Sequence, residues 1–228
     1  MLSDMKERID VVLKKIEDSA KRAGRDPKEI TLVAVSKNFP ADAVREAFSL
    51  GLKNFGENRA QELKDKYEKL KDIQAIWHFI GRIQTNKIKY FVPIVEYVHS
   101  VWREKELVEV NKRAKNLGKI IKIFFEVNVS GEETKAGVKI EDVKKLLDVA
   151  SKLENVKVIG LMTMAPVAEN PEDVRWVFRK LREVRDELRT EYPDLTELSM
   201  GMSGDFEVAI EEGATFVRIG TAIFGKRT

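Results

Sequence analysis

The chain has 228 residues, of which 43% are hydrophobic and 35% are charged, with 41 Lys and Arg against 38 Asp and Glu. This length and composition predict a folded protein with one sizeable core, and the balance of charge argues against a nucleic-acid-binding face. The lack of cysteine excludes disulfides, thiolate metal sites and a cysteine nucleophile. With only two histidines, a transition-metal site is not expected either.

Membrane and export signals are not expected in this sequence. The N-terminal residues include several acidic side chains, and no segment approaches the roughly 20 apolar residues of a membrane span. We therefore expect a cytoplasmic protein that binds neither membrane nor nucleic acid and exists as a monomer or weak dimer.

An amphipathic helix within residues 1–24 is followed by alternating strands and helices. Apolar residues at helical spacing predict the first helix, and short apolar runs bounded by glycine, proline and charge predict the strands. In chain order they are a strand from 32 to 37, helix 40–50, strand 53–56, helix 59–70, strand 75–81, helix 85–91, strand 97–101, helix 103–117, strand 120–128, helix 140–153, strand 156–162, a long helix from 170, strand 197–199, helix 204–212 and strand 215–219.

Eight strands, nearly all followed by a helical segment, predict a parallel α/β sheet. This number of units in a chain of this size favours one closed (β/α)8 TIM barrel over residues 1–228, with the first helix outside it. An open doubly wound sheet remains the alternative, although no G-x-G-x-x-G motif follows the first strand.

Lys37 closes the apolar run LVAVSKNFP, where lysine is uncommon. Two interpretations remain open. Lys37 is an ordinary charge that extends into water at the strand end, or it is held at the barrel mouth for its chemistry. In the second case we expect partial burial, which favours the neutral, nucleophilic amine.

The loops after strands seven and eight predict an anion site. Small and hydroxyl residues there let the backbone approach a ligand, and barrels frequently bind phosphate at this place. The alternative is that these are turn glycines with a capping Ser203. If strand one lies beside strand eight, Lys37 is close to these loops, and a lysine beside a phosphate anchor is what pyridoxal 5'-phosphate requires.

The sequence closely resembles the pyridoxal phosphate homeostasis proteins, relatives of the barrel domain of alanine racemase. Five specific strings carry this resemblance over nearly the whole chain: LVAVSKNFP, NFGENRAQEL from Asn54, WHFIGRIQTNK from Trp77, GLMTMAP from Gly160, and LSMGMSGDFEVAI with VRIGTAIFG from Leu198 to Gly225.

The resemblance implies a PLP fold-type III barrel with pyridoxal 5'-phosphate in a Schiff base to Lys37. It also implies that Arg218 faces the pyridine nitrogen. A permanently charged guanidinium there disfavours protonation of that nitrogen and so makes the ring a poorer electron sink. Alternatively, Arg218 simply pairs with a carboxylate. The implied phosphate contacts are Ser199, Gly201, Ser203, Gly220 and Thr221.

Several other polar residues are weighed between a site role and a structural one. Asn58, at a loop mouth, is a candidate cofactor contact, and His78 is either a cofactor contact or hydrogen-bonded packing within strand three. Gln84, Asn86 and Lys87 either line the pocket or cap a short helix. The run Lys64-Asp65-Lys66 is typical of a solvated helix face.

Two functions from different classes compete. The first is a non-catalytic carrier that holds pyridoxal 5'-phosphate and delivers it, with apo-enzymes as possible recipients. The second is a racemase or related enzyme, which needs an acid or base on each face of the substrate carbon. In alanine racemase the second group is a tyrosine from another domain, and the tyrosines of this chain are expected away from the active face. We therefore expect the carrier. A barrel binding another phosphorylated metabolite is a third possibility.

Overall fold

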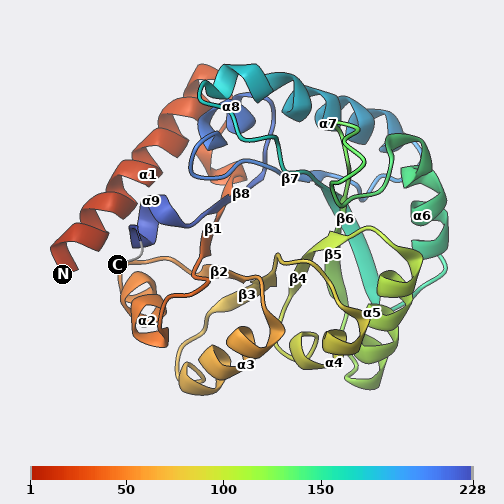
Figure 1. Cartoon of the computed structure of the whole chain (residues 1–228), viewed down its shortest axis with the longest axis horizontal. Coiled ribbons are helices and arrows are strands. Elements are labelled where there is room, and N and C mark those ends of the chain that lie inside the picture. The colour runs from red at the N-terminus through yellow and green to blue at the C-terminus, as the bar shows by residue number, and fades with distance from the viewer. Residues whose placement is uncertain (1, 227–228) are drawn as a thin grey trace.

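The computed structural model describes residues 2–226 and shows eight parallel strands that close into a barrel in chain order. The helices surround the strands, as Figure 1 shows. The closed barrel confirms the predicted fold class and excludes the open sheet. Residues 1, 227 and 228 of the predicted domain lie outside the described residues.

The strands are short apolar runs buried between the barrel interior and the helices, which is typical of parallel sheets. They are β1 (Thr31–Val35), β2 (Asn54–Glu57), β3 (Ile76–Phe79), β4 (Tyr97–Val101), β5 (Ile121–Glu126), β6 (Val156–Met162), β7 (Glu197–Ser199) and β8 (Phe216–Ile219).

The helices follow the predicted order, except that the last of them was not predicted and the long helix predicted from residue 170 begins at Arg175, after a 3-10 turn. They are α1 (Leu2–Arg22), α2 (Ala41–Ser49), α3 (Ala60–Lys69), α4 (Ile88–Phe91), α5 (Glu104–Asn116), α6 (Val143–Ala150), α7 (Arg175–Leu188), α8 (Phe206–Glu211) and α9 (Thr221–Phe224), with 3-10 turns at Pro27–Glu29, Thr85–Lys87, Ile140–Asp142 and Pro171–Val174. None of these helices is long and apolar enough to cross a membrane.

Three predicted strands extend past the ends of the strands in the structure. The first strand ends at Val35 and not at Lys37, because the chain turns at once and the Phe39 amide donates to the Ser36 carbonyl at 3.0 Å. The predicted strands 75–81 and 120–128 end at Phe79 and Glu126, where the backbone leaves the ladder for the active-face loops. Each error is one or two residues at a strand end, where the apolar pattern extends past the hydrogen-bonded ladder.

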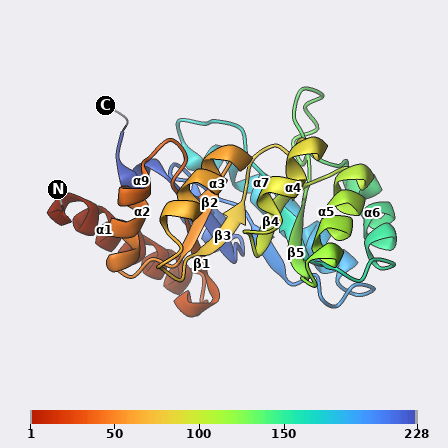
Figure 2. The same cartoon turned by 90° about the horizontal axis from the view of Figure 1, so that it is seen from below.

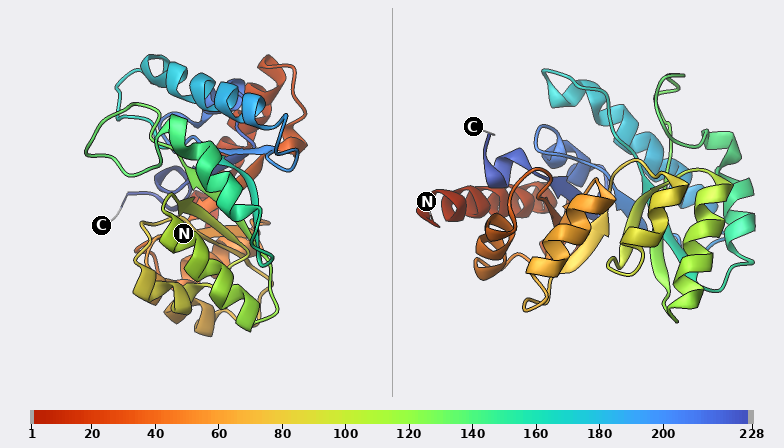
Figure 3. Two further views of the ribbon diagram at one scale, coloured as in Figure 1. Left: turned by 90° about the vertical axis from the view of Figure 1, so that its right-hand side faces the viewer. Right: turned by 60° about the horizontal axis from the view of Figure 1, so that its bottom comes forward.

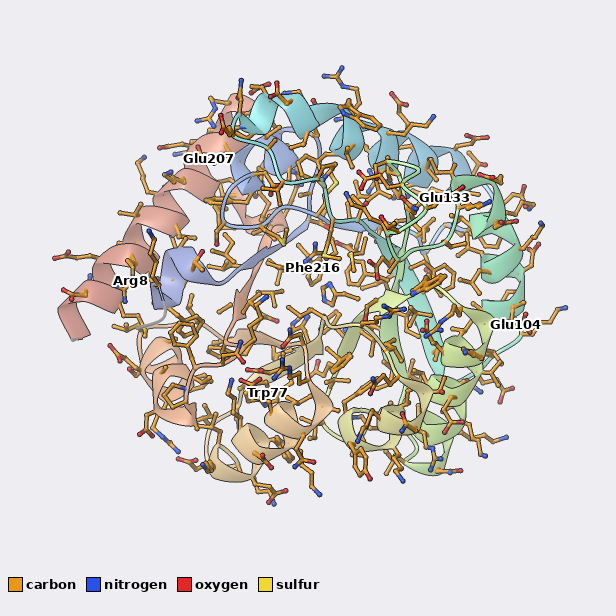
Figure 4. All side chains as sticks on the ribbon, in the orientation of Figure 1. Arg8, Trp77, Glu104, Glu133, Glu207 and Phe216 are labelled. Atoms are coloured by element: carbon orange, nitrogen blue, oxygen red, sulfur yellow. The ribbon has the colours of Figure 1, made fainter. Side chains whose placement is uncertain are left out.

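Helix α1 packs outside the barrel against α8 and α9. Its buried side chains recur at helical spacing, and the Nε of Arg8, labelled in Figure 4, donates to the Ile223 carbonyl at 2.7 Å. The buried face of the helix consists of Met5, Ile9, Val12, Ile16 and Ala20.

All carboxyl ends of the parallel strands lie on one side of the barrel. The long connection between β5 and α6 leaves from this side, and Figures 2 and 3 show it projecting beyond the helices. Catalytic and binding residues of such barrels come from this side.

The barrel interior contains an apolar cluster and a polar cluster that lie against each other. Phe216, near the centre of the barrel in Figure 4, packs with Val33, Phe124 and Met162. The polar cluster contains His78, His99, Ser199 and Arg218, all buried.

Gly160 in β6 tests the close packing of the barrel wall. A Cβ atom there would lie 2.1 Å from the Glu197 carbonyl oxygen on β7. We expect Gly160→Ala to lower the free energy of unfolding by about 1–3 kcal/mol, since backbone must shift to admit the methyl group. Gly204→Ala is the matched control because nothing lies within 4 Å of its Cβ position. Urea denaturation measures both variants, and equal midpoints would contradict the packing.

Candidate functional site

Lys37 lies in the turn directly after β1, and its side chain is exposed. The predicted partial burial is wrong in this structure, because the turn carries the side chain beyond the strand. The neighbouring residue Asn38 has φ 63°, the left-handed conformation that asparagine tolerates better than most residues. A strained turn of this kind needs support from its surroundings.

Strand pairing brings the Lys37 turn next to the end of β8. Val33 lies opposite Arg218 and Ala34 opposite Ile219 in the β1–β8 ladder. Gly220 follows directly, and a Cβ there would lie 3.2 Å from the Val35 carbonyl oxygen. The expectation that strand one lies beside strand eight is confirmed.

Arg218 points into the barrel and is only 4% exposed. Its Nη1 donates to the Ser199 carbonyl at 3.1 Å and to Ser199 Oγ at 2.6 Å, and its Nη2 donates to the Thr163 carbonyl at 3.0 Å. These acceptors are all neutral, so the alternative of a direct carboxylate pair does not hold among the described residues. Burial lowers the pKa of Arg218 to about 10, while the charges of Glu126 and Asp205 oppose this shift.

A chain of hydrogen bonds runs from Arg218 through the barrel interior. Ser199 Oγ pairs with His99 Nδ1 at 2.7 Å, His99 Nε2 pairs with His78 Nδ1 at 2.9 Å, and His78 Nε2 pairs with Asn54 Oδ1 at 2.9 Å. Asn54 begins β2, so the chain connects the active face with the opposite end of the barrel. It uses both ring nitrogens of His78, which is therefore a packing residue in this structure.

The directions of these bonds follow from the amide oxygen of Asn54, which only accepts. His78 Nε2 must donate, so His78 Nδ1 accepts from His99 Nε2, and His99 Nδ1 accepts from Ser199. Both imidazoles are neutral in this arrangement. Burial agrees with this, because it lowers the pKa of His78 to about 3 and that of His99 well below its ordinary value, and neighbouring positive charges add to both effects.

Both histidines are expected to be neutral Nε2–H tautomers at pH 7. The chain contains no other histidine, so ¹H–¹⁵N NMR reports the two rings without overlap. A protonated ring, or an Nδ1–H tautomer in either residue, would contradict the bond directions. His99→Gln is expected to change the His78 signals through the lost bond.

The protein is expected to lose stability on acidification from pH 6.5 toward pH 3. Folding lowers both histidine pKa values, so below pH 6.5 the unfolded chain takes up protons that the folded protein does not. The stabilisation is fully present above pH 6.5. Thermal unfolding between pH 8 and pH 4 measures it, and His78→Gln should show a shallower loss. Equal slopes for variant and wild type would contradict this.

The β7 and β8 loops meet at the predicted anion position. Ser203 Oγ accepts from the Ala222 amide at 3.4 Å, at the start of α9. Gly201 has φ 99° and packs so closely on α8 that a Cβ would lie 2.7 Å from Ala209 Cβ. Thr221 is exposed beside them. The loops therefore place Ser203, Gly220 and Thr221 together, whereas the Ser199 hydroxyl belongs to the interior chain.

Asn58 lies just after β2, and its Oδ1 is buried with no hydrogen-bond partner among the described residues. It lines a hollow together with Arg82, Gln84 and Lys87. Gln84 precedes the 3-10 turn without capping it through its side chain. Since no carboxylate lines the hollow, it is electropositive.

The sequence interpretation missed two groups. His99 completes the chain of hydrogen bonds inside the barrel. The only feature of the sequence that pointed to it was that the protein has just two histidines. Lys66, taken as part of a solvated face, is only 6% exposed and pairs with Glu57 and Glu62. Lys66 lies three residues after buried Leu63 and four before buried Leu70, but this spacing alone does not distinguish a buried lysine from one that extends into water.

No group of three or more His, Cys, Asp or Glu within the described range is arranged to hold a metal ion.

Comparison with known proteins identifies the family. The family model of the alanine racemase N-terminal domain matches residues 11–228. The pyridoxal phosphate homeostasis protein of Aquifex aeolicus is 54% identical over 222 residues, 97% of each chain, and that of Pseudomonas aeruginosa is 43% identical over 99% of this chain and 97% of its own. The solved structure of PipY from Synechococcus elongatus, with PLP bound, is 35% identical, has a TM-score of 0.84, and is matched over 97% of this chain and 100% of that one.

The chain therefore matches these relatives over almost their entire length, and it belongs to the pyridoxal phosphate homeostasis proteins, within the family of the alanine racemase N-terminal domain.

Proposed function

We propose that this protein binds pyridoxal 5'-phosphate through Lys37 and acts as a carrier in the homeostasis of this cofactor. The observation that carries the proposal is the juxtaposition of an exposed lysine after β1 with a buried guanidinium on the adjacent strand β8. PipY, which shares the barrel, is described with PLP bound. In the proposed role the protein works in the cytoplasm, as a monomer or weak dimer, with apo-enzymes as recipients.

The residues present suit this cofactor. A guanidinium has five N–H groups. Arg218 uses three of them in hydrogen bonds to described residues. The remaining donors, on Nε and Nη2, match an unprotonated pyridine nitrogen. The unpartnered Asn58 Oδ1 offers a further polar contact.

The phosphate fits the loops after β7 and β8. We assign it to Ser203, Thr221 and the backbone at Gly201 and Gly220, where hydroxyls and amide groups converge. Ser199, predicted among these contacts, is assigned instead to holding Arg218, because its hydroxyl bonds to His99 and Arg218.

When bound, the cofactor supplies an aldehyde that condenses reversibly with an amine. The Lys37 amine, once neutral, adds to the aldehyde carbon, and loss of one water leaves a C=N bond to Nζ. Water easily reaches the exposed Lys37 turn, so hydrolysis reverses the bond. Reversibility of this kind suits a carrier, whereas an enzyme gains from excluding water.

One observation favours an amino-acid enzyme as the second candidate. Glu126 ends β5, is only 5% exposed, and burial raises its pKa to about 7 against the attraction of Arg218. A carboxyl group with such a pKa exchanges protons near neutral pH. Tyr97 and Tyr192 give no support, since the Tyr97 hydroxyl pairs with Lys122 and that of Tyr192 with Asp148.

The covalent link is tested with pyridoxal 5'-phosphate and borohydride. We expect an absorbance band in the wild type that reduction fixes onto the peptide containing Lys37, and no such band in Lys37→Ala. Lys112→Ala, which removes another exposed lysine, is the matched control and should behave as wild type. A band that survives in Lys37→Ala would refute the assignment.

The carrier role is tested on the same loaded protein. Transfer of the cofactor to an apo-enzyme supports it. Rapid exchange of the amino-acid α-hydrogen in D₂O, lost in Glu126→Gln, would favour the enzyme instead.

A further inference from the structure

A second lysine lies buried beneath the turn that carries Lys37. Lys66 Nζ, on α3, donates to the Ser36 carbonyl at 2.6 Å, to Glu57 Oε1 at 2.6 Å and to Glu62 Oε1 at 2.9 Å. Its side chain is 6% exposed. All three ammonium hydrogens are used, which a buried charge requires.

The same cluster bonds to the backbone on both sides of Lys37. The Ser36 carbonyl accepts from Lys66, and the Asn38 amide donates to Glu62 Oε1. Ser36 Oγ also donates to Glu57 Oε1. The residues directly before and after Lys37 are thereby tied to one group of charges.

These bonds support a turn that is costly on its own. Asn38 has φ 63°, a conformation that L-residues adopt only where the surroundings determine it. The hydrogen bond from its amide to a carboxylate is stronger than a neutral one. Without this hydrogen bond, the turn constrains the position of the Lys37 Cα atom less.

Charge and exposure also distinguish the two lysines chemically. Lys66 has its positive charge between Glu57, which is completely buried, and Glu62. Its ammonium form is held by three acceptors, so it has no free electron pair for an aldehyde. Lys37 is exposed one residue from the same cluster. The arrangement therefore leaves Lys37 as the reactive amine.

We propose that Lys66, Glu57 and Glu62 form a positioning cluster, which holds the 36–39 turn so that Lys37 Nζ meets the aldehyde carbon of a phosphate-anchored ligand. The proposal rests on the proposed function. The cluster does not touch the ligand and acts only through the backbone of the turn. Its effect is to favour the covalent step over binding itself. A lysine whose backbone is already fixed loses less conformational entropy when it reacts.

Glu62 is the residue to change. Lys66→Met would leave Glu57 buried without its counter-charge and is expected to unfold the protein. Glu62 is 20% exposed in its side chain, and Glu62→Ala removes the bond to the Asn38 amide while Lys66 and Glu57 stay paired. Glu62→Gln keeps an acceptor oxygen for the amide. Asp65→Ala is the matched control, because Asp65 is an exposed carboxylate on the same helix that accepts a hydrogen bond from Gln61.

Two ligands separate positioning from binding. Pyridoxal 5'-phosphate reports the covalent step through its absorbance band. Pyridoxine 5'-phosphate has an alcohol in place of the aldehyde and reports non-covalent binding by calorimetry. We expect Glu62→Ala to weaken the covalent equilibrium about tenfold, with less than about a twofold change for pyridoxine 5'-phosphate. Glu62→Gln should lose less than Glu62→Ala, and Asp65→Ala should match the wild type.

Equal losses for both ligands, or no loss in Glu62→Ala, would overturn the positioning role. Amide hydrogen exchange of the segment 36–39, measured without ligand, gives an independent result. Exchange should be faster in Glu62→Ala than in Asp65→Ala, and equal exchange rates refute the cluster. Absence of the absorbance band in the wild type refutes instead the proposed function, so the two failures are distinguishable.

Discussion

Closure of the barrel between β1 and β8 is the constraint on which the site depends. The paired residues of the first and last strands are 185 positions apart in sequence, yet hydrogen bonding places Val33 opposite Arg218. This ladder brings the Lys37 turn, the Gly220 loop and the buried guanidinium to one side of the molecule. Helix α1 packs against α8 and α9 beside the same seam, so the extra N-terminal helix reinforces the place where the sheet closes.

The interior of the barrel carries several polar groups. Arg218, Ser199, His99 and His78 form one connected chain, and each of its bonds has a donor and an acceptor. A buried network is tolerated only when its members are satisfied. Aromatic rings cover it, since His78 stacks on Tyr97 at 4.4 Å and His99 on Phe124 at 4.4 Å. The neutral hydrogen-bond chain leaves Arg218 as its charged member and holds the guanidinium through Ser199.

Two lysines near the end of β1 have opposite environments. Lys37 is exposed, while Lys66 is buried between two carboxylates. Burial without partners would neutralise a lysine, but burial among acceptors keeps it charged. Environment and not residue type therefore decides which amine is available. An accessible Lys37 and a firmly held turn are compatible, because the backbone provides the rigidity and the side chain provides the access.

The sequence by itself determined the order of the elements and the loops that hold the candidate site, because these follow from local periodicity and from residues such as Gly201 and Lys37 at strand ends. It favoured the closed barrel, but only the pairing of β1 with β8 excluded the open sheet. It did not determine that Ser199 and His78 face inward, that His99 joins them, or that Lys66 is buried. Those facts depend on contacts between strands and helices far apart in the chain. A lysine on an amphipathic helix has the same local pattern whether it meets water or two carboxylates, and only the packing of α3 against the ends of β1 and β2 decides which.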